Sequence, residues 1–330
     1  MGFNEIVGQD GLIKVLKSSL KEDNLSHAIL IKGPAGSGKS TLAMILAGAL
    51  NCEGAEKPCE ECISCRRLVT NEHPDIKVIE AEGRNIKIDQ IREARVNFYY
   101  FTHGSGVRVC LIKDAHKLTG EAAALLLKVL EEPPDGLVFI LTTSFSSMLP
   151  GTILSRCQHF SMKKVEAGTM REFLKKKKPE TSAEAIDFAV KVGEGVPGRA
   201  LSVLDDPLWQ ENQGKVVLFA NKLFTGKLSE MELLAEAKDW SGNEDLNILL
   251  ELFSYFIKDG LFWNMTRQRD LITDDSTISF WEESFLESTF LKSSLELLND
   301  IRQQLRTNVN VNLALDTLFM QIKGRLEGDV

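Results

Sequence analysis

The chain has 330 residues, which is long enough for two or three domains with separate cores. Its hydrophobic content of 43% and charged content of 26% are ordinary for a soluble globular protein, and no apolar run reaches the length of a membrane span. The net charge of −8 argues against a protein that coats nucleic acid by itself. No secretory signal pattern is present at the N-terminus, which favours a cytoplasmic protein without a membrane partner.

Helical and strand patterns alternate in the first half of the chain. We expect strands at residues 27–32, 76–80, 107–112, 137–143 and 158–162, and helices at 8–22, 39–50, 88–101 and 121–131. Continuous apolar strands separated by helices are typical of a mostly parallel sheet that is covered on both faces. The pattern predicts a three-layer α/β nucleotide-binding domain over residues 1–164.

Strand patterns nearly disappear after residue 165. Residues 165–207 predict a small helical unit, which is interrupted by the glycines and proline of residues 193–198. Residues 208–330 are helical in pattern and rich in Leu and Phe. We interpret their apolar stripes as core or subunit-packing faces of an all-α domain.

A complete phosphate-binding loop follows the first predicted strand. Residues 33–40 read Gly-Pro-Ala-Gly-Ser-Gly-Lys-Ser and match G-x-x-x-x-G-K-[ST]. The glycines permit a turn in which backbone N–H groups face phosphates. A loop that keeps the motif but is blocked is the alternative. The pattern predicts that ATP or ADP with Mg²⁺ is held by Gly33, Pro34, Gly36, Ser37, Gly38, Lys39, Ser40 and Thr41, with Lys39 on the β- and γ-phosphates and Ser40 or Thr41 reaching the metal.

The second element of an ATPase site is incomplete. After the strand at 107–112, an ATPase normally carries two adjacent carboxylates, one for the metal and one to activate water. This chain reads Lys113-Asp114-Ala115-His116, which offers one carboxylate in any register. Lys113 could occupy part of the Mg²⁺ site, or it could point to solvent and leave Asp114 to act alone. The sequence therefore predicts a site that holds ATP and hydrolyses it poorly.

Four cysteines follow the helix that begins at the phosphate loop. Cys52, Cys59, Cys62 and Cys65 give the spacing C-x6-C-x2-C-x2-C, which is typical of a closed structural zinc site. Disulfides are the weaker interpretation in a reducing compartment. A redox pair is also disfavoured, because all four thiols cluster on an insertion. We expect a structural zinc ion here.

Two arginines and one basic stretch have alternative interpretations. Arg156, in Ser-Arg-Cys, could reach the nucleotide of a neighbouring subunit, since a planar and permanently charged group suits developing phosphate charge. An ordinary surface salt bridge is the alternative. Arg199 could be a lid arginine that touches the γ-phosphate, or an ordinary helix residue. The lysine-rich residues 163–178 predict a solvated helix face, with nucleic-acid contact as the alternative.

Together these segments resemble the bacterial clamp-loader subunits of the AAA+ superfamily. The resemblance is firm over the first 205 residues and looser in the tail, where residues 308–315 resemble the last collar helix of those proteins. It is carried by Val7-Gly8-Gln9, the phosphate loop, the four-cysteine insertion, Leu-Leu-Lys-Val-Leu-Glu-Glu-Pro-Pro at 126–134 and Leu-Pro-Gly-Thr-Ile-Leu-Ser-Arg-Cys at 149–157.

The resemblance implies a division of labour along the chain. Residues 1–164 would be the AAA+ core, 165–207 the lid and 208–330 the collar that holds an oligomer together. Val7 and Gly8 would line the adenine pocket, Thr143 or its neighbour Ser144 would be the polar sensor, Arg199 the lid arginine and Arg156 the arginine finger in trans. The partners implied are gamma/tau and delta subunits in a five-membered ring, the sliding clamp and primed DNA.

Within that family the chain is closer to the delta-prime type than to the motor subunits. The gamma/tau motors usually carry Asp-Glu-x-His where this chain has Lys113-Asp114-Ala115-His116, and residues 195–201 are similar to the delta-prime lid. Some delta-prime proteins lack the phosphate loop that this chain retains. We therefore expect a subunit of the DNA polymerase III assembly that binds ATP and hydrolyses it weakly, and is not itself the polymerase. A gamma/tau-like ATPase motor and a zinc-dependent nucleic-acid binder are the alternatives.

Overall fold

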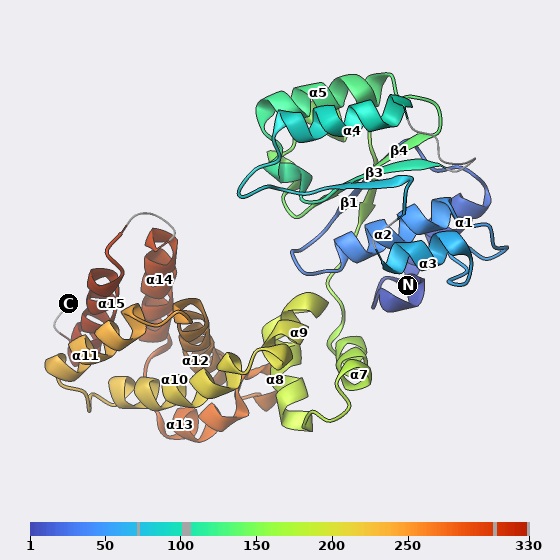
Figure 1. Cartoon of the computed structure of the whole chain (residues 1–330). Coiled ribbons are helices and arrows are strands. Elements are labelled where there is room, and N and C mark those ends of the chain that lie inside the picture. Colours follow the sequence, from blue (N-terminus) through green and yellow to red (C-terminus); the bar gives the residue numbers. More distant parts are fainter. Residues whose placement is uncertain (71–72, 101–106, 306–308, 329–330) are drawn as a thin grey trace. The chain divides into compact units, whose positions relative to one another are not determined.

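The computed structural model describes residues 1–70, 73–100, 107–305 and 309–328. The chain forms two compact units (Figure 1). The first consists of Met1–Thr181 with Gly193–Leu201, and the second of Ser182–Val192 with Ser202–Val330. The segment 165–207 is thus divided between the two units. The separate lid and collar domains stay predictions.

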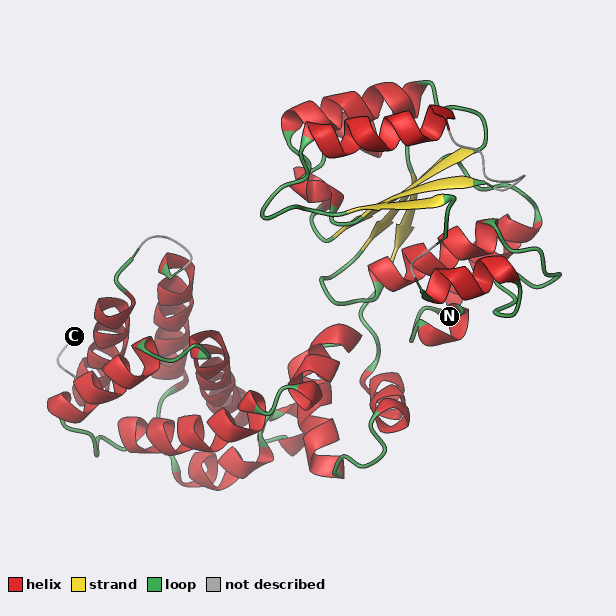
Figure 2. Cartoon of the chain, viewed as in Figure 1, coloured by secondary structure: helices red, strands yellow, loops and turns green. Residues whose placement is uncertain are grey.

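A parallel sheet forms the centre of the first unit, as the strand pattern predicted (Figure 2). Its strands run in the order β2-β3-β4-β1-β5, and all neighbouring pairs are parallel. β1 lies between β4 and β5, with Lys32 in register with Thr143 and Ser161. The strands are β1 Ala28–Lys32, β2 Ile76–Ile79, β3 Arg108–Ile112, β4 Leu137–Thr143 and β5 Gln158–Ser161.

Helices cover both faces of this sheet (Figure 1). Leu30 and Phe139 pack in the core cluster that includes α4 and α5, whereas Ile29 and Ile140 pack in the cluster that includes α1 and α2. Successive side chains of a strand point to opposite faces, so both faces must be apolar when both are covered. The prediction of a three-layer α/β unit is confirmed.

The predicted strands and helices of this unit agree with the observed bounds within two residues. Residue 101, at the end of the predicted helix 88–101, lies outside the described residues. Two short helices, α3 and α6, had no prediction, because neither is long enough to show a helical period. The helices are α1 Asp10–Lys21, α2 Lys39–Leu50, α3 Ile63–Val69, α4 Ile88–Tyr100, α5 Gly120–Glu131, α6 Gly151–Leu154 and α7 Ala167–Lys177.

The second unit is helical and has an aromatic core. Phe219, Trp240, Phe253 and Phe319 are buried, with ring centroids between 4.8 and 6.2 Å apart. Of the two interpretations of the apolar stripes, core or subunit packing, these four rings are core. The boundary between the units falls within α8 and α9. The helices are α8 Ala183–Gly193, α9 Pro197–Asp205, α10 Leu208–Phe224, α11 Glu230–Ser241, α12 Leu246–Thr266, α13 Ile278–Glu283, α14 Ser288–Gln304 and α15 Val311–Glu327.

The predicted collar motif at 308–315 overlaps the start of α15, and its first residue lies outside the described part of the chain. Across the described ranges, no helix combines the length and apolarity that crossing a bilayer requires.

Candidate nucleotide-binding site

The phosphate-binding loop connects β1 to α2. Gly36 and Gly38 have φ angles of +79° and +90°, a region that side chains rarely adopt, so glycine is required for this turn. Lys39, the first residue of α2, is only 6% exposed, and its Nζ donates to the carbonyl of Pro34 at 2.7 Å. At the start of the loop, the N–H of Gly33 donates to the carbonyl of Thr143 at 3.3 Å. The loop therefore closes on itself around a buried ammonium at a helix N-terminus.

A cavity of 530 Å³ lies against this loop, within the size range of small-molecule sites. The loop and the start of α2 contribute residues 35–41 to its wall, and the other walls come from five further segments of the same unit. Those segments supply Glu5, Ile6 and Val7, then Asp114 and Ser144, then Phe173 and Lys177 of α7, and Pro197, Gly198 and Leu201 of α9.

The first residues of α9 contact the phosphate loop directly. The N–H of Gly198 donates to the carbonyl of Gly36 at 2.8 Å. A Cβ at position 198 would lie 2.7 Å from that oxygen, so only glycine permits this approach. Arg199 follows at once and is half-buried, but its side chain is not part of the cavity wall. The structure thus brings the backbone of the predicted lid to the loop.

Asp114 is the carboxylate at the end of β3 that faces the cavity. Its N–H donates to Thr142 Oγ1 at 3.1 Å, and its Oδ2 pairs with Lys117 Nζ at 3.1 Å. Lys113 pairs instead with Glu80, with 3.3 Å between Nζ and Oε2, and does not line the cavity. Lys113 is therefore outside the cavity wall, which agrees with the interpretation in which it points away from the site, and the role of Asp114 stays a prediction.

Charge and burial act in opposite directions on Lys39. Burial lowers its pKa, and the negative charge of Asp114 raises it again. His116, two residues beyond Asp114, has a pKa lowered by burial, and its Nδ1 lies 3.2 Å from Thr143 Oγ1. Thr143 also accepts the N–H of Phe145 at 3.1 Å. Thr143 is therefore tied to its own strand end, and of these two candidate sensor residues it is Ser144 that lines the cavity wall.

Of the two predicted adenine-pocket residues, Val7 and Gly8, only Val7 lines the cavity. Gly8 turns the chain with a φ of +65°. Gln9 bonds twice to the backbone of Lys163: its Nε2 donates to the carbonyl at 2.7 Å and its Oε1 accepts the N–H at 3.0 Å. These bonds fix the N-terminal segment beside the strand end.

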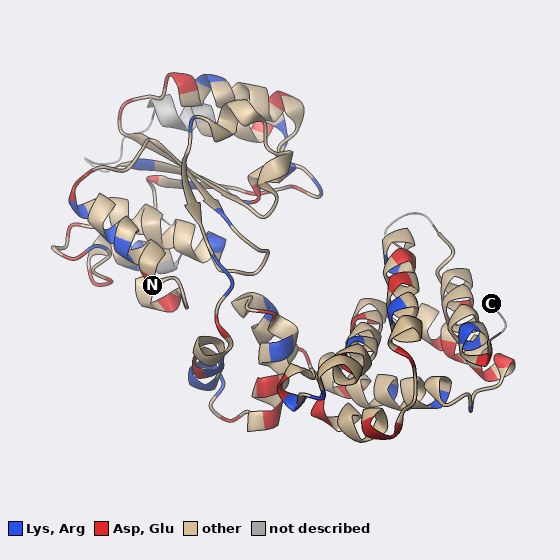
Figure 3. Cartoon of the chain, turned by 180° about the vertical axis from the view of Figure 1, so that it is seen from behind, with Lys and Arg blue, Asp and Glu red and all other residues tan. Residues whose placement is uncertain are grey.

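Phe173 and Lys177 also line the cavity, although no sequence pattern predicted them as site residues. Both lie on α7, four positions apart, and therefore on one face of the helix. The lysine-rich stretch predicts a solvated face, and Figure 3 shows basic residues gathered at the end of α7. The i, i+4 spacing of Phe173 and Lys177 can be read from the sequence and places both on one helix face. Only the packing of α7 shows that this face lines the cavity beside the phosphate loop.

Arg156 lies on the surface of the first unit, away from the chain's own cavity wall. It follows α6, and its side chain is 36% exposed. Its Nη2 donates to Glu131 Oε1 at 2.6 Å, and its Nη1 donates to the carbonyl of Thr152 at 3.0 Å. Within this chain the guanidinium thus makes a surface salt bridge, which is the alternative interpretation of Arg156.

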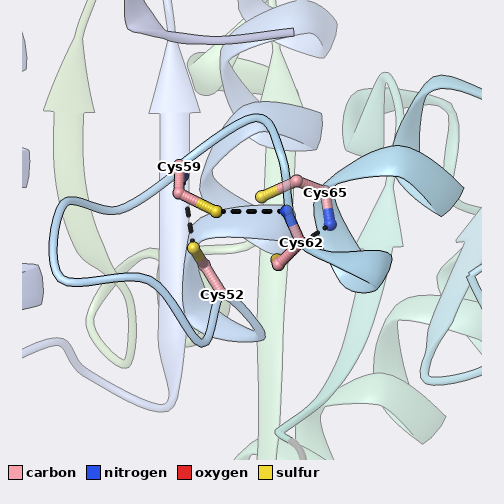
Figure 4. A group of neighbouring side chains, drawn as sticks. All are labelled: Cys52, Cys59, Cys62 and Cys65. Atoms are coloured by element: carbon pink, nitrogen blue, oxygen red, sulfur yellow. Dashed lines mark hydrogen bonds between the residues drawn. The ribbon is translucent and has the colours of Figure 1, made fainter.

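The four predicted zinc ligands converge after α2 (Figure 4). Their sulfur atoms all lie within 4.8 Å of one another, and all four thiols are free. Sulfurs around one tetrahedral zinc stand about 3.8 Å apart, given a Zn–S distance of ~2.3 Å. The cluster consists of Cys52, Cys59, Cys62 and Cys65. Its spacing and chemistry fit a single closed metal site.

Backbone N–H groups already point at these sulfurs. The Sγ of Cys52 accepts the N–H of Cys59 at 3.2 Å, and the Sγ of Cys59 accepts the N–H of Cys62 at 3.3 Å. The N–H of Cys62 is the largest of the influences that lower the pKa of Cys59 to about 6. Burial raises the pKa of Cys65 to about 12. One thiol is therefore ready to ionise, whereas a buried one needs a cation to do so.

Comparisons with known proteins agree with these features. Residues 8–166 match the family described as "DNA polymerase III, delta subunit". Over 97% of its length the chain is 28% identical to the DNA polymerase III tau subunit of Bacillus subtilis, and it covers 61% of that protein. Over 62% of its length it is 36% identical to the gamma/tau subunit of Mycobacterium tuberculosis, of which it covers 37%.

The fold has a solved counterpart. A DNA polymerase III, gamma subunit-related protein of Thermotoga maritima superposes with a TM-score of 0.51 and 22% identity, over 96% of this chain and 99% of that one. The chain spans between 35% and 61% of the length of the first three curated relatives that it matches. Residues 8–166 are therefore similar to a family described for the DNA polymerase III delta subunit, and the chain as a whole is similar to gamma and tau subunits of that polymerase.

Proposed function

We propose that this chain is a delta-prime-type subunit of the DNA polymerase III clamp loader, which binds ATP or ADP and hydrolyses it poorly or not at all. One observation carries the proposal. The cavity joins a complete phosphate loop to a single carboxylate from the end of β3, Asp114, and that carboxylate is paired with Lys117. Hydrolysis needs a positioned base for the attacking water as well as a charged cradle for the phosphates.

Each wall of the cavity has a proposed role toward the nucleotide. The backbone of residues 33–38 and the ammonium of Lys39 would bind the phosphates, with Ser40 and Thr41 as the hydroxyls nearest to a magnesium ion carried in on them. Val7 and Ile6 supply an apolar wall for the base. Ser144 and Thr143 would sense the terminal phosphate, and Arg199 would join them from the lid.

Arg156 is the group that this subunit would lend to a neighbour. It lies on the surface rather than in its own cavity, and an exposed pair with Glu131 is weak enough for an incoming phosphate to replace. Arginine at such a position stabilises the charge that develops on the transferring phosphoryl group. This chain would then act as a stator that completes the site of an adjacent motor subunit.

The proposed assembly rests on the names of the proteins and of the family that this chain resembles. Its relatives are named gamma and tau subunits of DNA polymerase III, and its matching family is named for the delta subunit. We propose a five-membered ring with gamma/tau and delta subunits that loads the sliding clamp on primed DNA. Residues 208–330 would form the collar, residues 165–207 the lid, and a zinc ion on the four cysteines would hold the insertion after α2.

A gamma/tau-like ATPase motor is the second candidate. The names of the relatives favour it, because the tau subunit of Bacillus subtilis and the gamma/tau subunit of Mycobacterium tuberculosis are similar to this chain, and the phosphate loop is intact. In that case Asp114 would activate water after leaving Lys117. The two candidates differ in one measurable property, the turnover of ATP at this subunit's own site.

The test compares steady-state ATP hydrolysis by the isolated chain and by the reconstituted ring. A stator binds nucleotide, turns over little by itself, and leaves most ring turnover in place when Lys39→Ala empties its site. A motor loses ring turnover with Lys39→Ala as fully as when a gamma subunit is disabled. Absence of nucleotide binding by the unmodified chain would reject both candidates.

A further inference from the structure

The wall of the nucleotide cavity has a polar part and an apolar part. The phosphate loop and the ends of β3 and β4 supply the polar part. The apolar side chains come from three separate segments: Ile6 and Val7 before α1, Phe173 on α7, and Pro197 and Leu201 on α9. A nucleotide has the same division, with a charged polyphosphate at one end and an aromatic base at the other.

Val165, a buried residue two positions before α7, joins these three apolar segments. A Cβ at Gly8, which follows Val7, would lie 2.8 Å from Val165 Cγ1, so the N-terminal segment packs closely against it. The N–H of Val165 donates to the carbonyl of Gly195, two positions before α9, at 2.7 Å. The N-terminal segment, α7 and α9 are therefore held next to one another at the apolar part of the wall.

Phe173 is the one aromatic side chain on this wall among the described residues. Its helix is anchored by Met170 and Leu174, which are fully buried, whereas Phe173 itself is half-buried. In the described part of the chain no other ring and no cation is paired with it. A ring that faces a cavity without a partner ring is available to a flat aromatic ligand.

We propose that Phe173 stacks on the base of the bound nucleotide and gives this site a preference for purine over pyrimidine nucleotides. Aromatic side chains bind bases through their π-faces, and a purine offers a larger face than a pyrimidine. Ile6, Val7 and the apolar residues of α9 give van der Waals contact but no such face. The proposal rests on the proposed function, because it requires that the cavity bind a nucleotide.

The test compares ADP, CDP and inorganic tripolyphosphate, which has no base, by calorimetry on the full chain. Phe173→Ala should weaken ADP binding about tenfold, weaken CDP binding less, and leave tripolyphosphate binding unchanged. Equal losses for ADP and tripolyphosphate would show a merely structural role and overturn the proposal, as would unchanged ADP binding. Failure of the unmodified chain to bind ADP would instead reject nucleotide binding itself.

Two further variants separate stacking from apolar packing. Phe173→Leu keeps an apolar side chain but removes the ring, so ADP affinity should fall nearly as far as in Phe173→Ala. Phe173→Tyr keeps the ring and should bind ADP like the unmodified chain. Phe285→Ala removes a ring that is 99% exposed in the second unit and serves as the control. Full ADP affinity in Phe173→Leu would overturn the stacking role.

A fluorescent ring at the same position reports the contact directly. The native tryptophans all lie in the second unit, at residues 209, 240, 263 and 281. Phe173→Trp therefore adds the first tryptophan of the nucleotide-binding unit, and its emission is obtained by subtracting that of the unmodified chain. ADP should quench this emission, and tripolyphosphate should not. Unquenched emission in a variant that binds ADP by calorimetry would overturn the proposal.

Discussion

The nucleotide cavity and the surface segment after α6 that carries Arg156 belong to the same unit, but they hold their charged groups in different ways. Lys39 is buried, begins a helix and is bonded to its own loop. Arg156 is 36% exposed and is held by one carbonyl and by the carboxylate of Glu131, which is itself 45% exposed. A buried group held by main-chain geometry keeps its place, whereas an exposed ion pair is worth only about 0–1 kcal/mol and exchanges readily.

That difference suits the two proposed tasks. Binding of a phosphate inside the cavity needs a preformed cradle, since ordering it at each encounter would cost affinity. A group offered to another subunit must instead leave its resting partner when the other phosphate arrives. The same physical contrast predicts which variants change nucleotide binding by this chain and which change hydrolysis by its neighbours.

The largest effect is expected for Arg156→Ala. Hydrolysis at the neighbouring site should fall by about 10³–10⁵ when its arginine finger is removed, whereas nucleotide binding by this chain should not change. Single-turnover hydrolysis in the reconstituted ring measures the first and calorimetry the second. Arg92→Ala, which breaks another surface pair at 2.9 Å with Asp89, is the matched control. Equal rates for the two variants would refute the role in trans.

For Lys39→Ala, in contrast to Arg156→Ala, nucleotide binding by this chain is expected to weaken. Removing the buried ammonium takes away charge-assisted hydrogen bonds to phosphate, so affinity should fall roughly 10–100-fold. Lys176→Ala, on an exposed lysine that does not line the cavity, serves as the control. If ADP bound Lys39→Ala as tightly as the control, the phosphate loop would not be the binding site.

Faster hydrolysis at the neighbouring site is expected for Glu131→Gln. This change removes the charge of Arg156's resting partner, so hydrolysis at the neighbouring site should rise by up to about fivefold, because the pair is worth at most ~1 kcal/mol. In the background Arg156→Ala the same change should have no effect. A fall in the rate, or an effect that survives without Arg156, would mean that Glu131 acts in some other way.

A smaller loss of nucleotide affinity, compared with Lys39→Ala, is expected for Lys177→Ala. Lys177 reaches the cavity from α7 and is more exposed than Lys39, so screening by solvent limits the loss of affinity to about two- to fivefold. Lys176→Ala again serves as the control, since it removes the same charge from the same helix. Titration at raised salt should reduce the difference between the two variants if the effect is electrostatic.

The smallest effect on nucleotide chemistry is expected at the cysteine cluster. The chain purified without added metal should hold about one zinc ion, and Cys62→Ser should remove it and lower the unfolding temperature, because metal binding contributes to folding. Nucleotide affinity should persist at temperatures where the variant is folded. Cys157→Ser changes a thiol outside the cluster and should retain the metal. Metal analysis that finds none in the unmodified chain would remove the site.

Much of the fold could be predicted from local pattern. The strands of the first unit are continuous apolar runs, and their helices begin and end near Gly, Pro and polar residues, so their bounds were found within two residues. The apolar stripes of residues 208–330 were predicted as core or subunit-packing faces, and the burial of Phe253 on α12 identifies that stripe as core. The short helices α3 and α6 escaped prediction, because one or two turns carry no measurable period.

The sequence by itself determined the phosphate loop and the cluster of thiols, because each depends on residues a few positions apart whose backbone turns bring them together. Tertiary structure alone decided that Lys113 meets Glu80 while Asp114 faces the cavity, that Ser144 and not Thr143 lines it, and that Lys177 joins it from α7. It also brought Arg156 to Glu131, 25 residues earlier in the chain. Such pairings depend on how separate elements pack, and no spacing along the chain specifies that.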